Sequence, residues 1–220
     1  MNLQNVSYLT QMEGASVKVA ILTFVIALIS TFNSVCFSQS LSGIRIGENL
    51  ANVSRLGRPS VQNQRGIFTL SRWRFEDGNE LSITSITSTG RIVYIESDWG
   101  ERQAGTISDF PGFYYGRTTL IDIRKRFGNN GFTYPDRAAM KIGDAIIMSN
   151  SYEVLGRDNV VATFMTRIAG KNIRFSQQDP SIAANFTELV SIALGDPQYL
   201  RSIWGSNLTF DIDYNKILWK

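Results

Sequence analysis

FTLSRWRFEDGNELSITSI, residues 68–86, is the stretch that decides the predicted fold. Two runs rich in β-branched and aromatic residues flank a central Asp77-Gly78 pair. This pair can adopt the positive φ angles of a tight hairpin turn. A second turn at Ser88-Thr-Gly90 leads into Arg91-Ile-Val-Tyr-Ile-Glu96, which also reads as a strand. The sequence therefore predicts an antiparallel meander built from these strands.

A short helix is expected immediately before this meander. Residues 47–57 place Leu50, Val53 and Leu56 at helical spacing, and Gly57 followed by Pro59 ends the helix. The same order returns further along the chain. A helix is expected over residues 116–128 and a hairpin over 145–154 and 160–168, and residues 172–175 are a candidate for the next strand.

The expected fold class is α+β, with two tandem helix-plus-antiparallel-meander repeats and a C-terminal helical and strand extension. The predicted domains are a signal peptide (1–40), the first repeat (41–105), the second repeat (106–176) and the extension (177–220). In the extension, an apolar stripe from Ile182 to Ala193 predicts a helix that ends at Gly195. Asp196-Pro197 starts a second short helix, and residues 208–214 alternate as a strand.

The N-terminal region resembles an export signal. Lys18 precedes an apolar run of roughly 14 residues, which small and polar residues follow. A membrane-spanning helix needs about 20 apolar residues, so an uncleaved anchor is the weaker alternative. Small residues allow cleavage after Ser38 or after Ser40, and both sites remain open. We expect a periplasmic or secreted protein with no integral membrane span after processing.

The single cysteine, Cys36, falls within this expected signal region. The processed protein should then have neither a thiol nor a disulfide, so its stability must come from its core. Lipid attachment at Cys36 is an alternative. The preceding Asn33-Ser34-Val35 departs from a lipobox, because a polar residue replaces the usual Leu and the branched Val35 replaces the usual Gly or Ala.

The composition removes the usual parts of many enzymes. The chain has no histidine, and no cysteine is expected to remain after processing, so the commonest general base and the thiol nucleophile are missing. We expect no enzyme activity, no catalytic residues, no cofactor and no metal site. Asp211 and Asp213 would share one face of a strand and could hold a hard cation, but a solvated face is the simpler interpretation. A net charge of +3 argues against a nucleic-acid partner.

Two groups of residues are candidates for contacting a partner. Arg72 and Arg74 flank Trp73, and strand alternation should send both arginines to the face opposite Trp73. Arginine is enriched in the hot spots of interfaces, so this face is a candidate binding surface. The second group gathers aromatic residues near the junction of the two repeats, where either a domain seam or a cleft can form: Tyr94, Trp99, Tyr114 and Tyr115.

The first repeat resembles a known family. Its pattern combines Ile46-Gly47, Leu56-Gly57-Arg-Pro59, Trp73-x-Phe75, Asp77-Gly78 and Gly90-x-Ile92, and is similar to the BamE-like (SmpA/OmlA) domain of bacterial envelope lipoproteins. It also looks like the tandem fold of the secreted β-lactamase inhibitor protein. The second copy carries two extra residues between its glycines and lacks a clear Trp-x-Phe strand. The resemblance implies a helix and an antiparallel sheet that occur twice, and a binding role.

The leading functional hypothesis is an exported, non-catalytic binding protein of the bacterial envelope or secreted space. Its expected partner is another envelope or secreted protein, with an anionic surface as a further possibility. Two alternatives remain open, which are a carboxylate-based hydrolase of envelope glycans and a purely structural envelope protein. A hydrolase would place two acidic residues in one cleft, with one of them strongly desolvated.

Overall fold

One antiparallel sheet dominates the part of the chain that the structure describes. This computed structural model describes residues 40–156, 160–170, 172–173, 180–210 and 213–219, so the expected signal peptide, apart from Ser40, lies outside the described residues. Within these ranges the sheet has ten strands, in the order β1-β2-β3-β4-β11-β10-β9-β7-β12, with β8 paired to β9. Strands β5 and β6 form a separate pair.

The N-terminal half contains the meander that the sequence predicts. Its elements are η1 (Leu50–Leu56), β1 (Val61–Arg65), β2 (Phe68–Arg74), β3 (Glu80–Ile86) and β4 (Ile92–Asp98). The hairpin of residues 68–86 is confirmed, because Phe68 pairs with Ile86 and Arg74 with Glu80. At its turn the Asn79 amide donates a 2.9 Å hydrogen bond to the Asp77 carboxylate, and Gly78 has a φ of 87°. The first predicted helix is a 3-10 helix, which ends at Gly57 as expected.

The middle of the chain supplies the second predicted helix and hairpin. Its elements are β5 (Thr106–Ile107), β6 (Tyr114–Tyr115), α2 (Leu120–Phe127), β7 (Phe132–Thr133), η2 (Pro135–Arg137), β8 (Ala139–Ile142), β9 (Ala145–Glu153) and β10 (Val161–Ile168). Helix α2 buries Leu120, Ile123 and Phe127 and ends at Gly128, whose φ is 89°. Strands β9 and β10 form the expected antiparallel hairpin.

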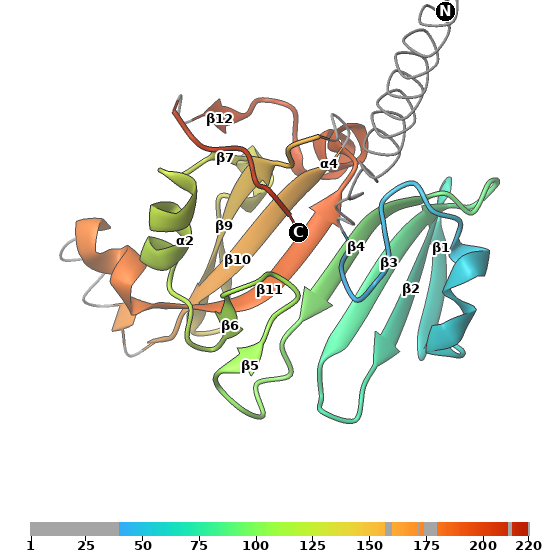
Figure 1. The fold of residues 1–220 in the computed structure, drawn as a ribbon, viewed down its shortest axis with the longest axis horizontal. Coiled ribbons are helices and arrows are strands. Elements are labelled where there is room, and N and C mark those ends of the chain that lie inside the picture. Colours follow the sequence, from blue (N-terminus) through green and yellow to red (C-terminus); the bar gives the residue numbers. More distant parts are fainter. Residues whose placement is uncertain (1–39, 157–159, 171, 174–179, 211–212, 220) are drawn as a thin grey trace, which may run out of the picture. The chain divides into compact units, whose positions relative to one another are not determined.

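The C-terminal part differs most from the prediction. It contains η3 (Pro180–Phe186), β11 (Thr187–Gly195), α4 (Pro197–Trp204) and β12 (Thr209–Phe210). The helix predicted to end at Gly195 is wrong from residue 187 onward, where the chain forms a nine-residue strand. In Figure 1 the orange strand β11 lies between β10 and the green strand β4, and antiparallel pairing joins it to both. The short helix after Asp196 is confirmed as α4.

The position of β11 overturns the expected fold class. Two tandem helix-plus-meander repeats would each close their own sheet, but the last long strand is inserted between the two halves and joins them into one sheet. Residues 187–195, which were predicted to belong to the first helix of the C-terminal extension, are thus a central strand. The physical reason is burial on both faces. A central strand is apolar on both sides, so its spacing of apolar residues cannot be told from that of a buried helix.

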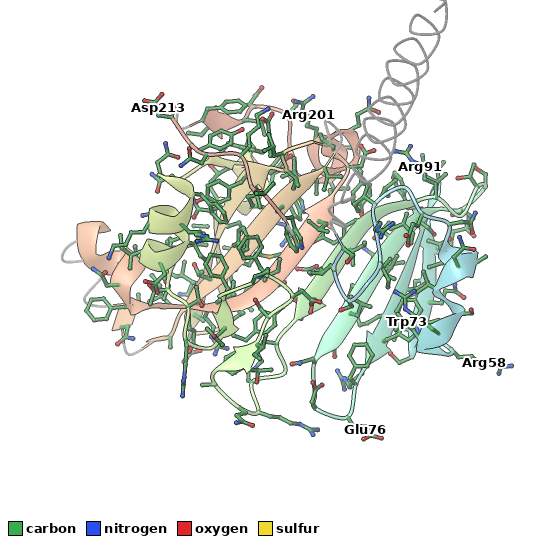
Figure 2. The ribbon with its side chains drawn as sticks, in the orientation of Figure 1. Arg58, Trp73, Glu76, Arg91, Arg201 and Asp213 are labelled. Carbon is green, nitrogen blue, oxygen red and sulfur yellow. The ribbon has the colours of Figure 1, made fainter. Side chains whose placement is uncertain are left out.

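The sheet packs a hydrophobic cluster against each of its faces. On β10, Phe164 belongs to one cluster and its neighbour Met165 to the other, as alternation along a strand requires. The first cluster also takes in α2 and Trp73, which is labelled in Figure 2. The indole nitrogen of Trp73 donates to the carbonyl of Gly57 at 3.1 Å. Helix α4 contributes Leu200 and Trp204 to the second cluster, so α2 and α4 cover opposite faces.

Candidate functional site

A polar strip crosses the sheet on the face that α4 covers. Strand register aligns Arg72 of β2 with Ser82 of β3 and Glu96 of β4 in one cross-strand row. The next row aligns Arg74, Glu80 and Asp98. Side chains of directly opposed residues on one face lie within about 5.5 Å at their Cβ atoms, and diagonal neighbours lie within about 8 Å. Arg72 of the first row reaches Glu80 of the second at 3.6 Å, so the two rows form one polar cluster.

Aromatic side chains stand beside this strip. Tyr199 of α4 packs edge-on against Phe68 with ring centroids 4.9 Å apart, and lies 5.8 Å from Tyr94. Tyr94 also meets Trp204 at 5.6 Å. The Arg137 guanidinium of η2 lies over the Trp204 ring, 5.2 Å from its centroid. The rings and the Arg72 row enclose a pocket of about 350 Å³, which also reaches Arg65 at the end of β1.

The charges within the strip are partly paired. Glu80 forms ion pairs with Arg74 and with Arg72. The Arg72 Nε lies 3.6 Å from the Glu80 carboxylate. The Arg72 Nε also donates to the Ser82 hydroxyl at 3.3 Å. Ser191, the β11 residue opposite Asp98, donates to the Glu96 carboxylate at 3.2 Å. The acidic residues thus draw on both neighbouring strands.

Two carboxyl groups of β4 have perturbed protonation. Burial raises the pKa of Glu96 above its ordinary value, although hydrogen bonds from Tyr94 and Ser191 oppose the shift. Burial and the nearby Glu96 raise the pKa of Asp98 to about 7. Two carboxyl groups two residues apart on one strand face repel each other when both are ionised, which disfavours the doubly charged form. At neutral pH Asp98 is therefore partly protonated, and the pair can donate as well as accept hydrogen bonds.

Arg72 and Arg74 lie where alternation predicts, on the face opposite Trp73. Arg72 lines the pocket, while Trp73 packs in the cluster on the other face. The Arg74 side chain is 72% exposed, although it pairs with Glu80. Both arginines are therefore accessible for contact with a partner.

The aromatic residues predicted near the repeat junction do not form one surface. Tyr94 lines the pocket, but Trp99 and Tyr115 pack with the cluster on the opposite face. The Tyr115 hydroxyl donates to the Ser97 carbonyl at 3.2 Å and is buried. Tyr114 is exposed on β6. The repeat junction that was expected to gather these four residues does not exist in the single sheet.

Four residues of this site were not predicted from the sequence: Glu96, Asp98, Arg137 and Tyr199. The two carboxylates could have been found, because residues two apart on a predicted strand share one face. The same spacing predicts a shared face for Asp211 and Asp213, of which Asp211 lies outside the described residues and Asp213 is exposed. Arg137 and Tyr199 reach the pocket only through long-range packing, for which the sequence carries no local signal.

A second pocket of about 570 Å³ opens near the start of α4. Arg91 and Arg201, both labelled in Figure 2, are among its lining residues. Two of its cationic side chains form ion pairs within the protein. Arg91 pairs with Asp196 at 2.7 Å, and Lys216 pairs with Glu153 at 2.6 Å. The smaller pocket contains Arg72 and Tyr94, which the sequence indicated as contact residues, and is therefore the stronger candidate site.

Over the described ranges, no cluster of three or more His, Cys, Asp or Glu side chains is placed to hold a metal ion. In the same part of the chain, no helix has the length and apolar character needed to cross a membrane.

No protein-family model matches the chain, and no curated protein matches it. Among solved structures it is similar to an extracellular protein from Bacillus anthracis that contains an SCP domain, with 12% identity and a TM-score of 0.42. The alignment covers 80% of this chain and 52% of that protein, so the chain spans about half of its length.

Proposed function

We propose that this chain is an exported, non-catalytic binding protein that recognises a partner protein through the sheet face of β2, β3 and β4. The observation that carries the proposal is the Arg72–Ser82–Glu96 row, which forms the polar floor of an aromatic-walled pocket with Arg74 exposed beside it. Aromatic residues and arginine are enriched in the cores and hot spots of protein interfaces. The apolar run after Lys18 supports export, and a periplasmic or secreted location belongs to the same proposal.

The test is capture of a partner from envelope extract by the chain from Leu41 onward. An Arg72→Gln, Arg74→Gln variant removes both guanidiniums without adding a negative charge beside Glu80, which pairs with both. Lys125→Gln, Arg126→Gln is the matched control, because these exposed residues lie on α2, on the other side of the sheet. We expect the native chain and the control to capture the same protein and the double arginine variant to lose it.

Two results would count against the proposal. One is a captured protein that binds the arginine variant as well as it binds the native chain. The other is the absence of any captured protein when circular dichroism shows that the native chain is folded.

A second candidate function is a carboxylate-based hydrolase of envelope glycans. Glu96 and Asp98 favour it, because both have raised pKa values and share one strand face. A glycosidase needs one protonated and one ionised carboxyl group. Hydrolysis of purified envelope glycan that is lost in both Glu96→Gln and Asp98→Asn would favour this candidate over a binding protein.

A further inference from the structure

The pocket on the α4 face carries more positive charge than its own acidic residues neutralise. Its lining includes Arg65, Arg72 and Arg137, but a single acidic residue, Glu96. Arg72 is engaged by Glu80 and Ser82. Within the described ranges, neither Arg65 nor Arg137 forms an ion pair with a carboxylate. An anion would therefore meet two guanidinium groups that no protein carboxylate neutralises.

Arg137 is the better placed of these two arginines. It comes from η2, is half-buried, and lies over the Trp204 ring. Burial raises the pKa of Glu96 and of Tyr199, and the positive charge of Arg137 opposes both shifts, which places its field within the pocket. Arg65 is exposed and pairs across the strands with Phe68, so it lies at the rim. A ligand anion would be held mainly by Arg137.

The rest of the pocket suits a flat apolar group. Phe68, Tyr94, Tyr199 and Trp204 present rings from two strands and one helix, and Leu70 and Ile203 add aliphatic surface. Ring stacking and edge contacts favour planar groups at centroid separations of about 4.5–7 Å. The volume of about 350 Å³ lies at the lower end of the range for small-molecule pockets.

Glu96 at the floor does not exclude an anion. Burial raises the pKa of its carboxyl group, and Ser191 hydrogen-bonds to it from the neighbouring strand. A carboxyl group that retains its proton adds no negative charge and can donate a hydrogen bond to a bound oxygen anion. The raised pKa of Glu96 therefore reduces the negative charge that the floor presents to a bound anion.

From this arrangement we infer that the pocket binds an organic carboxylate carried on a flat apolar group, with Arg137 as its principal anchor. The inference rests on the proposed function, because it names the ligand chemistry of the same sheet face. The carboxylate belongs to a free small molecule or to the end of a peptide chain that finishes in an aromatic residue. An aromatic ammonium is the opposite case, and it would use Glu96 and the rings.

Three isosteric probes decide between these charges: 3-phenylpropanoate, 3-phenylpropanamide and the 3-phenylpropylammonium ion. Calorimetric titration of the chain from Leu41 onward at pH 7 should show the carboxylate binding roughly tenfold or more tightly than the amide, the effect of one charge-assisted hydrogen bond. The ammonium should bind most weakly. A Gly-Gly-Gly-Phe peptide and its C-terminal amide distinguish a chain end from a free acid.

The anchor is tested by substitution. Arg137→Gln should weaken 3-phenylpropanoate binding about tenfold and leave the amide unchanged, because one charged donor is lost. Arg126→Gln on α2 removes the same charge on the other side of the sheet and should change neither affinity. If Arg137→Gln does not fold, the comparison of the three probes on the native chain still decides the question.

Equal affinity for the acid and the amide, tighter binding of the ammonium, or no binding by the folded chain would each overturn the inference. These failures are separate from failure of the proposed function. If partner capture depends on Arg72 and Arg74 but no probe binds, the proposed binding function is supported and the carboxylate site is ruled out. If the pocket binds the carboxylate selectively but no protein is captured, the carboxylate site is supported and the proposed partner-protein function is contradicted.

Discussion

Asp98 is a residue of the described sheet whose ionised form is destabilising in the folded protein. It lies beside Glu96 on one face of β4 and opposite Glu80 on β3. Burial and these neighbours raise its pKa from 3.8 to about 7. A carboxyl group whose pKa is higher in the folded state is destabilising when ionised. Its cost is absent below the unfolded pKa and grows as the pH rises toward the folded pKa.

Asp98→Asn should therefore stabilise the protein in a pH-dependent way. At pH 8 the free energy of unfolding should rise by roughly 2 kcal/mol, less than the full pKa difference implies because the side chain keeps some exposure. At pH 4 the variant and the native chain should be nearly equal, since Asp98 is then protonated in the folded state. Urea unfolding at both pH values measures the difference.

Asp213→Asn is the control, because Asp213 is exposed. A gain in stability from Asp98→Asn that is the same at pH 4 and pH 8 would show that packing, and not ionisation, sets the cost of this residue.

Helix α4 is the element that links the pocket to the sheet. Its N-cap, Asp196, is buried and accepts hydrogen bonds from the amides of Gln198 and Tyr199 at 2.9 and 3.4 Å. The same carboxylate pairs with Arg91 at 2.7 Å. The Asp196 amide also donates to the Val93 carbonyl of β4. One residue therefore caps the helix and ties it to the strand that carries Glu96.

Replacing Asp196 by alanine should destabilise the protein more than the equivalent change at α2. Asp196→Ala loses the cap and the ion pair with Arg91, and should lower the free energy of unfolding by about 2 kcal/mol. Thr119→Ala removes only the exposed capping box of α2, and should cost about 1 kcal/mol. Urea unfolding of both variants checks the order. A larger loss at Thr119 would contradict the linking role of Asp196.

At the scale of the whole described region, β11 joins the two halves. Its residues 187–195 pair with β10 along their length, and residues 191–195 also pair with β4. Ile192 and Leu194 of this strand are fully buried. Without β11, both β4 and β10 would become exposed edges of apolar sheets, which favour aggregation.

A fragment of residues 41–176, which covers the two expected repeats, should therefore not fold. We expect no cooperative urea transition by circular dichroism, whereas residues 41–220 should unfold in a single transition with the same midpoint by circular dichroism and tryptophan fluorescence. If the short fragment unfolds cooperatively at the same urea midpoint as the longer chain, residues 41–176 fold without β11 and the prediction is wrong.

The candidate site was only partly predictable. The arginines followed from alternation on β2, a local rule that holds wherever a strand forms. Tyr94 was predicted to belong to an aromatic junction, but it lines a pocket because α4 packs over it. Arg137 and Tyr199 are distant in sequence from the strands they meet, and their contribution depends on which face each helix covers.

The sequence by itself determined the local features of this protein: the Asp77-Gly78 hairpin, the α2 face of Leu120, Ile123 and Phe127, and the start of α4 at Asp196. Each depends on interactions among neighbouring residues, such as turn geometry, periodicity and capping. Only the tertiary structure decided that residues 187–195 form a strand and that this strand lies between β4 and β10. The apolar run suits a buried helix or a central strand equally well, and long-range hydrogen bonds to two partner strands made the choice.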